Sequence, residues 1–155
     1  MIRNLNKKGD GERTVTIFVG APGSGNSAVS DDKTSTGKID WTNATNGKGA
    51  NATIKFDPAS NPSILTKDAK TGIVSGANRP KEIGIAHEMI HGQHINKGTV
   101  DMSSGTTNYK TASGTQTQTI KKEEINTIGL SGSSSNGATE NKIRKEQGLD
   151  ARGGY

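Results

Sequence analysis

The alternation of hydrophobic and polar residues predicts short β-strands in the first half of the chain. RTVTIFVG (13–20) alternates and is rich in β-branched residues, which is typical of a strand. GKIDW (37–41), NATIKFD (51–57) and TGIVSG (71–76) are predicted to be further short strands. Gly-, Asn- and Pro-containing turns separate these segments, so the first half predicts a small sheet with polar connections.

The pattern changes to a helical one at residue 80. PKEIGIAHEMIHGQHINKG (80–98) has Pro80 at a plausible first helical position and the acidic Glu82 in the first turn. Gly98 follows Lys97, as is typical of a helix end. Glycines inside this segment, at 84 and 92, each disfavour the helix by about 1 kcal/mol. A helix over 80–98 is nevertheless the prediction.

The remainder of the chain predicts two shorter helices. Residues 99–117 are rich in Thr, Ser and Gly, which favours a loop. TIKKEEINTIGL (119–130) predicts a helix that ends near Gly129. TENKIRKEQG (139–148) predicts another, with Thr139 as its N-cap. Strands followed by helices indicate an α+β domain.

Composition limits the core and excludes several classes of protein. The chain has 155 residues, which suits one domain over 1–155, but only 28% are hydrophobic and 21 are glycine. We therefore expect a small core with long polar loops, and disorder in residues 1–12. The chain has no cysteine, which excludes disulfides and thiolate metal sites. It has no apolar run long enough to span a membrane and no Sec-type signal sequence.

The net charge of +5 does not indicate nucleic-acid binding. The basic runs are short, most are interleaved with acids, and aromatic residues are absent from them. The sequence also disfavours a nucleotide site. GAPGSGNS (20–27) nearly matches a phosphate loop, but Asn26 replaces the lysine that would meet the phosphates. The segment after it does not resemble a helix, so a Gly-rich turn is the better interpretation.

The candidate chemistry lies in HEMIH (87–91). On a helix, His87 and His91 differ by about 40° of rotation and about 6 Å of rise, so both imidazoles can hold one metal ion. Zinc accepts such ligands and leaves a position open in catalytic sites. Glu88 is the predicted general base. The motif sits in a predicted helix with apolar residues in its variable positions, which favours a zinc site over a chance match.

His94 is the nearest candidate for a third ligand, but a regular helix holds it too far away. It lies about 10.5 Å along the axis from His87, whereas the ion should sit between His87 and His91. A lining role in the cleft, a cap at the helix end and a plain surface position all remain open for His94. It could act as a ligand only if Gly92 opened the helix early.

A glutamate on the following helix is the better candidate. With about 100° per residue, the apolar face of 119–130 is centred near Ile125 and Ile128, Glu124 lies close to that face, and Glu123 lies on the opposite side. A carboxylate turned towards the core is costly unless it is paired or metal-bound. Glu124 is therefore the predicted third ligand. The alternative, that both glutamates are solvated, stays open.

The second half of the chain resembles the NleD-like family of bacterial effector zinc metallopeptidases, which includes type III secretion effectors and the C-terminal domains of polymorphic toxins. The resemblance lies in RPKEIGIAHEMIHGQHINKG, in EEINTIGL and in the closing ENKIRKEQGLDARGGY. It implies a compact zincin-like domain with His87 and His91 as ligands, Glu88 as base and the EEINTIGL glutamate as third ligand. The final RGGY is similar to the family's Arg-x-x-Tyr ending, so Tyr155 is a candidate for stabilising the oxyanion.

Together these observations predict a zinc endopeptidase of the gluzincin type, HExxH followed by Glu. The resemblance further implies delivery into a target cell by a specialised secretion system and cleavage of a protein there, with an immunity protein as a candidate partner. The alternative is a non-enzymatic interaction module in which zinc only stabilises a thin core.

Overall fold

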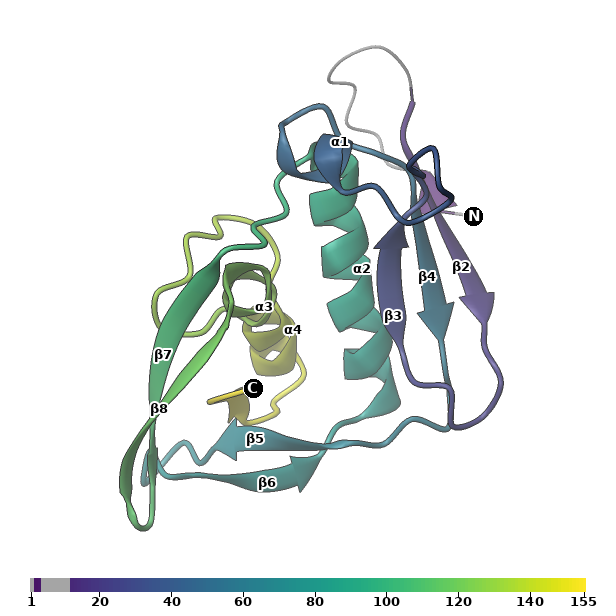
Figure 1. Ribbon diagram of the computed structural model, residues 1–155. Helices are drawn as coiled ribbons and strands as arrows, with labels where there is room; N and C mark the ends of the chain where they lie inside the picture. Colours follow the sequence, from purple (N-terminus) through teal and green to yellow (C-terminus); the bar gives the residue numbers. More distant parts are fainter. Residues whose placement is uncertain (1, 4–11) are drawn as a thin grey trace. The chain divides into compact units, whose positions relative to one another are not determined.

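The computed structural model describes residues 2–3 and 12–155. The predicted disorder of residues 1–12 therefore concerns mainly residues outside the described part. Contacts divide the chain into two compact units, Met1–Ser60 with Glu88–Asp101 and Asn61–His87 with Met102–Tyr155. Helix α2 (Lys81–Lys97) contributes to both units (Figure 1). A single domain over 1–155 stays a prediction.

The first unit is built on a four-stranded sheet in the order β1-β2-β4-β3. Strands β2 and β4 are parallel, whereas β1 pairs with β2 and β3 pairs with β4 in antiparallel fashion. The elements of this unit, besides its part of α2, are β1 (Ile2–Arg3), β2 (Thr14–Val19), β3 (Ser27–Ser30), α1 (Thr42–Thr45) and β4 (Ala52–Phe56).

Glycine allows helix α2 to approach this sheet closely. A Cβ atom at Gly92 would lie 3.2 Å from the Ile54 side chain and 3.3 Å from that of Val15. Both of these side chains are buried core residues on neighbouring strands. Further along the helix, the Asn96 side-chain amide donates to the backbone carbonyls of Thr14 and Ala50 at 3.1 and 2.8 Å. Gly92 therefore lowers the intrinsic stability of the helix but allows it to pack closely against the sheet.

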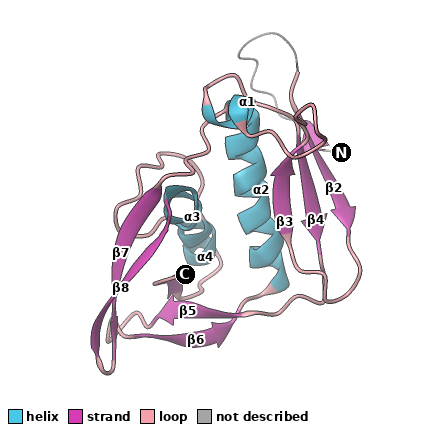
Figure 2. Ribbon diagram, viewed as in Figure 1, coloured by secondary structure: helices cyan, strands magenta, loops and turns pink. Residues whose placement is uncertain are grey.

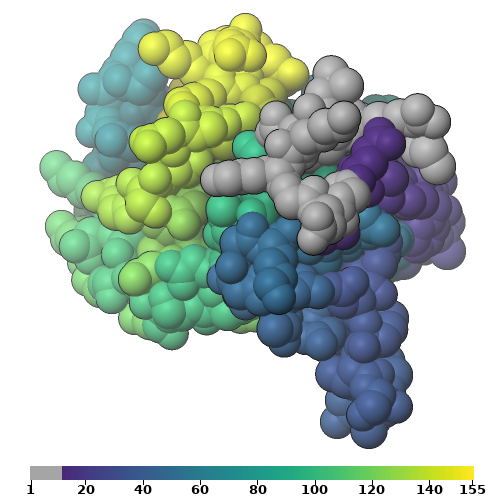
Figure 3. Space-filling model, turned by 90° about the horizontal axis from the view of Figure 1, so that it is seen from above, coloured from purple at the N-terminus to yellow at the C-terminus, as the bar shows by residue number. Residues whose placement is uncertain are grey.

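The second unit contains a three-stranded sheet in the order β6-β5-β9, a separate β-hairpin and two short helices (Figure 2). One apolar cluster of this unit consists of Ile125, Ile128 and Leu130, with Ile120 packed against them. The hairpin and the C-terminal residues are visible at the surface in Figure 3, in green and yellow. The elements are β5 (Ser63–Lys67), β6 (Val74–Asn78), β7 (Ser104–Thr111), β8 (Gly114–Lys121), α3 (Lys122–Ile128), α4 (Glu140–Glu146) and β9 (Ala151–Arg152).

Most predicted elements are confirmed. The segments 13–20 and 51–57 form β2 and β4, and 80–98 forms α2. The segment 139–148 forms α4, where the Thr139 hydroxyl accepts a hydrogen bond from the Lys142 N–H at 3.2 Å. Within the described residues, no helix combines the length and the apolar character needed to cross a membrane.

Two predictions about elements are wrong. GKIDW contributes only an isolated bridge from Ile39 to Lys33, because the Asp40 carboxylate accepts the Thr42 N–H at 2.8 Å and turns the chain into α1. Residues 99–117, predicted as a loop, supply most of the β7–β8 hairpin. Its strands are polar on both faces, so no hydrophobic alternation marks them. Since β8 extends to Lys121, helix α3 begins only at Lys122.

The approach of Gly49 to helix α2 generates a stability prediction. Gly49 has a φ of +77°, and a Cβ atom there would lie 1.9 Å from the Asn96 carbonyl oxygen. Gly47 has a φ of +84° but open space around its Cβ position. Gly47→Ala should cost about 1 kcal/mol for the left-handed backbone. Gly49→Ala should cost about 1–3 kcal/mol more, because the backbone must move. Urea unfolding checks this, and equal midpoints for the two variants would contradict it.

Candidate metal centre

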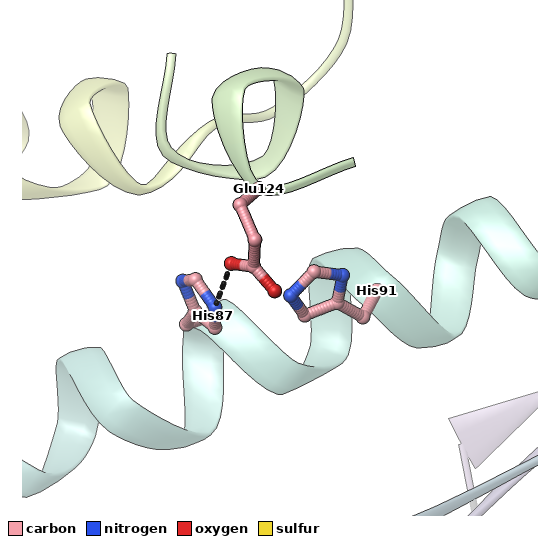
Figure 4. A group of neighbouring side chains, drawn as sticks. All are labelled: His87, His91 and Glu124. Carbon is pink, nitrogen blue, oxygen red and sulfur yellow. Dashed lines mark ion pairs between the residues drawn. The ribbon is translucent and has the colours of Figure 1, made fainter. Parts of the chain in front are cut away.

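Helix α2 presents His87 and His91 one turn apart, and Glu124 from helix α3 completes the cluster (Figure 4). One ligand atom from each residue lies within 4.8 Å of the others. Among the described residues, this is the group of histidine and carboxylate side chains that could hold a metal ion. His94 lies on the same helix but is not part of it. The sequence-based choice of Glu124 over His94 therefore agrees with the geometry.

The ligand atoms of His87 and Glu124 face each other directly. His87 Nε2 lies 3.3 Å from Glu124 Oε2, and the side chains are 5% and 20% exposed. Two imidazole nitrogens and a carboxylate oxygen form a donor set that suits zinc. An ion placed among these atoms would replace a contact between two groups that are both good zinc ligands. The residues present therefore fit zinc.

Helix periodicity was wrong for the neighbour of Glu124. Glu123 was expected on the solvent side of the helix, yet it is 5% exposed. Its carboxylate accepts a hydrogen bond from the Thr127 hydroxyl at 3.3 Å. Helix α3 contacts β7, β8 and α4, so this seven-residue helix is enclosed on more than its apolar face. Glu123 is consequently buried, whereas Glu124 stays partly exposed.

A second carboxylate holds His87 from the other side of its ring. Glu140 is completely buried at the start of α4, and its Oε2 lies 2.9 Å from His87 Nδ1. A carboxylate only accepts hydrogen bonds, so Nδ1 carries the proton and donates, and Nε2 is left to face Glu124. A carboxylate behind a ligating histidine fixes its tautomer and orientation in metal sites.

Two arginines surround the same carboxylate. Arg152 Nη1 donates to Glu140 Oε2 at 3.1 Å, and Arg144 Nη1 lies 3.5 Å from Oε1. Burial by itself raises the pKa of Glu140, but the hydrogen bond from His87 and the charge of Arg152 outweigh it and hold the pKa below its usual value. Glu140 is therefore ionised at neutral pH and remains a hydrogen-bond acceptor for His87.

Glu88 and Tyr155 occupy different surroundings. Glu88 follows His87 on α2 and is 8% exposed. Tyr155 is 49% exposed, and its ring lies 5.0 Å from the guanidinium carbon of Arg152. The side chain of Gln118 on β8 both donates to and accepts from the Tyr155 backbone, at 2.7 and 3.0 Å. The C-terminal tyrosine is thus attached to the arginine that holds Glu140, while its role towards an oxyanion stays a prediction.

Glu140, Arg144 and Arg152 were not among the residues selected from the sequence. Glu140 stands directly after an N-cap, where an acidic residue favours the helix dipole, so nothing in the local pattern separates it from an ordinary first-turn glutamate. Arg152 belongs to the Arg-x-x-Tyr ending, where attention fell on the tyrosine. The role of Glu140 becomes visible only in the structure, because its contact with His87 joins residues 53 positions apart in the sequence.

The Gly-rich loop at 20–27 directs its backbone towards a carboxylate of the protein. The Gly25 N–H donates to the buried Asp57 carboxylate at 2.9 Å, and the Asp57 N–H donates to the Asn26 side chain at 2.7 Å. Burial raises the pKa of Asp57, but backbone donors including Gly25 and Ala59 lower it more, so the net direction is down. Strand β3, not a helix, follows the loop. These features disfavour a phosphate-binding loop.

Comparison with known proteins agrees with this geometry. No curated protein gave a significant match to the chain. A solved structure of the botulinum neurotoxin serotype HA light chain is similar with a TM-score of 0.51 and 18% sequence identity. The match covers 89% of this chain and 31% of the light chain, and it confirms the predicted α+β, zincin-like fold. The model of the Peptidase_M91 family, described as effector protein, matches residues 1–155. The chain therefore belongs to the Peptidase_M91 family of effector proteins.

Proposed function

We propose that this protein is a zinc-dependent endopeptidase in which His87, His91 and Glu124 hold the ion and Glu88 is the general base. The observation that carries the proposal is the group of three ligand atoms within 4.8 Å, with a buried carboxylate following the first histidine on the same helix. Membership of a peptidase family supports this choice over a binding module.

The ligand set favours a catalytic ion over a purely structural one. Structural zinc sites are closed by four protein ligands, whereas catalytic sites use three. The group found among the described residues has three members. When bound, zinc supplies Lewis-acid polarisation of a peptide carbonyl and of a water molecule.

The residues of the chain supply the proton transfers and the alignment. The Glu88 carboxylate takes a proton from the attacking water and returns it to the leaving amine. Glu140 holds the His87 ring through Nδ1 and keeps Nε2 available as a ligand atom. The Tyr155 hydroxyl is our candidate donor to the oxyanion that forms on the peptide carbonyl. His94 takes no part in these steps, and cleft lining, helix capping and a surface position all stay open for it.

The family description as effector protein supports action inside a target cell. We propose that a specialised secretion system delivers the protein and that its substrate is a protein of that cell. An immunity protein in the producing cell is the partner that such a toxin would require. Likeness to the neurotoxin light chain contributes the fold alone to this proposal.

Glu88→Gln tests the general base. The amide keeps the size of the side chain but cannot accept the proton, so peptide cleavage should fall by about 10²- to 10⁴-fold while zinc content stays unchanged. Glu82→Gln is the matched control, because Glu82 is exposed in the first turn of the same helix. Cleavage of an unfolded protein and zinc content by mass spectrometry provide the readouts. A wild-type rate in the Glu88 variant refutes the mechanism; zinc binding without cleavage in the wild type favours the non-enzymatic module.

His91→Ala and His94→Ala separate the two histidines that follow His87. His91→Ala should weaken zinc binding by more than the roughly 100-fold expected from losing an outer partner of a ligand. His94→Ala should retain one zinc ion per chain, because His94 lies outside the cluster. Competition with a chromophoric chelator measures both. If His94→Ala lost more zinc affinity than His91→Ala, the proposed set of ligands would be wrong.

Glu140→Gln tests the buried partner of His87. The variant loses the charge that orients the ring and leaves Arg144 and Arg152 without their buried anion, so zinc affinity should fall by about 10- to 100-fold. Glu146→Gln, an exposed change on the same helix, serves as control. Circular dichroism verifies the fold of each variant before chelator competition. Unchanged affinity in a folded Glu140→Gln protein would show that the contact does not position the ligand.

A further inference from the structure

The segment 152–155 is held closely along its length, although only its first residue belongs to a β-strand. A Cβ atom at Gly153 would clash with the Val74 side chain, and one at Gly154 would lie 2.8 Å from the Leu65 side chain. A larger residue at either position would have to displace its neighbour. The two glycines therefore let the backbone run against the β6-β5-β9 sheet.

A side-chain amide fixes each end of this segment. The Arg152 N–H donates to Asn141 Oδ1 at 2.6 Å, and Asn141 Nδ2 donates to the Arg152 carbonyl oxygen at 3.0 Å. The Tyr155 N–H donates to Gln118 Oε1 at 3.0 Å, and Gln118 Nε2 donates to the Tyr155 backbone oxygen at 2.7 Å. Each amide thus supplies both an acceptor and a donor to one residue, as a neighbouring strand would. The second contact is called the Gln118 clip below.

The Gln118 clip orders a side chain at the surface and not one in the core. Tyr155 is 49% exposed, and hydrogen bonds at such a position compete with water and add little to the free energy of unfolding. The Tyr155 ring lies over the guanidinium group of Arg152. Arg152 Nη1 donates to Glu140 Oε2, the same oxygen that His87 Nδ1 contacts. The clip therefore holds Tyr155 beside the support of a proposed zinc ligand.

We propose that Gln118 is a positioning residue of this peptidase, an inference that rests on the proposed function. Its two hydrogen bonds fix the Tyr155 backbone, and the contact with Arg152 directs the ring. The hydroxyl is thereby held where it can donate to the oxyanion of the substrate. Without the clip, the ring samples more positions and the donor is in place for only part of the time. Gln118 itself acts only through Tyr155.

Gln118→Ala tests the clip in the zinc-loaded full chain. It should lower kcat about tenfold, with KM and zinc affinity within about twofold of wild type, because only the alignment of a donor used in the transition state is lost. Gln118→Glu keeps the acceptor but loses the donor, so kcat should fall as well. The matched control, Gln116→Ala, removes the same side chain from an exposed position on β8 and should behave like wild type.

A double-mutant cycle assigns the effect to the tyrosine hydroxyl. Tyr155→Phe keeps the ring and the backbone contacts with Gln118, and it should lower kcat by about 10²- to 10³-fold. Adding Gln118→Ala to this variant should change kcat by less than about twofold, since no donor is left to align. The same tenfold loss in both backgrounds would show a merely structural role and overturn the proposal. An unchanged kcat in Gln118→Ala alone overturns it too.

Fluorine NMR of the fluorotyrosine-labelled chain measures the position of the ring without catalysis. The chain has two tyrosines, Tyr109 and Tyr155, so Tyr155→Phe assigns both signals. With Co²⁺ in place of zinc, the Tyr155 signal should show a paramagnetic shift in wild type and in Gln116→Ala, and a smaller one in Gln118→Ala. No shift in wild type, or an equal shift in Gln118→Ala, overturns the proposal.

Failure of the proposed function gives a different result. The wild type would then show the paramagnetic shift of Tyr155 and its dependence on Gln118 but would cleave no protein. That outcome refutes the peptidase and confines Gln118 to ordering the segment 152–155. Cleavage by the wild type together with an unchanged kcat in Gln118→Ala refutes only the role of the clip.

Discussion

The contact between Glu140 and His87 is the interaction on which the rest of the candidate centre depends. A fully buried carboxylate is costly unless its partners compensate it, and here one imidazole and two guanidinium groups do so. Removing any of these partners would leave charge in the interior. The imidazole is therefore held in one tautomer and one orientation, with Nε2 directed at Glu124. The ring is positioned before any ion binds, which lowers the cost of assembling the ligand set.

The backbone contributes the other half of this positioning. His87 and His91 are carried by one continuous helix, so their spacing follows from helix geometry. The later part of that helix is fixed by its approach to β2 and β4 at Gly92 and by the two bonds from Asn96. Glu124 is placed by a different device: β8 runs directly into α3, so the register of the hairpin determines where the first turn of the helix begins. The helix spacing follows from a sequence-local pattern, whereas the hairpin register does not.

The difference between local and non-local constraints explains how much of the site could be predicted from the sequence. The candidate ligands lie in two helices with clear local signals, and so His87, His91 and Glu124 could be selected from the sequence. The expectation for Glu123 failed because periodicity describes one apolar face, whereas a two-turn helix can be enclosed on several. Glu140 and Arg152 could not be selected, since their importance arises from contacts across the chain. The hairpin was missed for a related reason: strands whose two faces are both polar carry no period-two signal.

The composition of the chain gives the polar network a second consequence. One apolar cluster of the second unit is formed by only three buried residues, Ile125, Ile128 and Leu130. The buried polar residues of that unit, among them Glu123, Thr127, Glu140, Arg144 and Arg152, occupy interior that a more hydrophobic chain would fill with aliphatic side chains. Buried charges of this kind rarely stabilise a fold more than well-packed apolar side chains would, but they are compatible with few alternative arrangements. The second unit thus combines a thin core with a histidine held in one orientation. An ion bound to that histidine would stabilise the folded unit, in which apolar burial contributes only modestly to the free energy of unfolding.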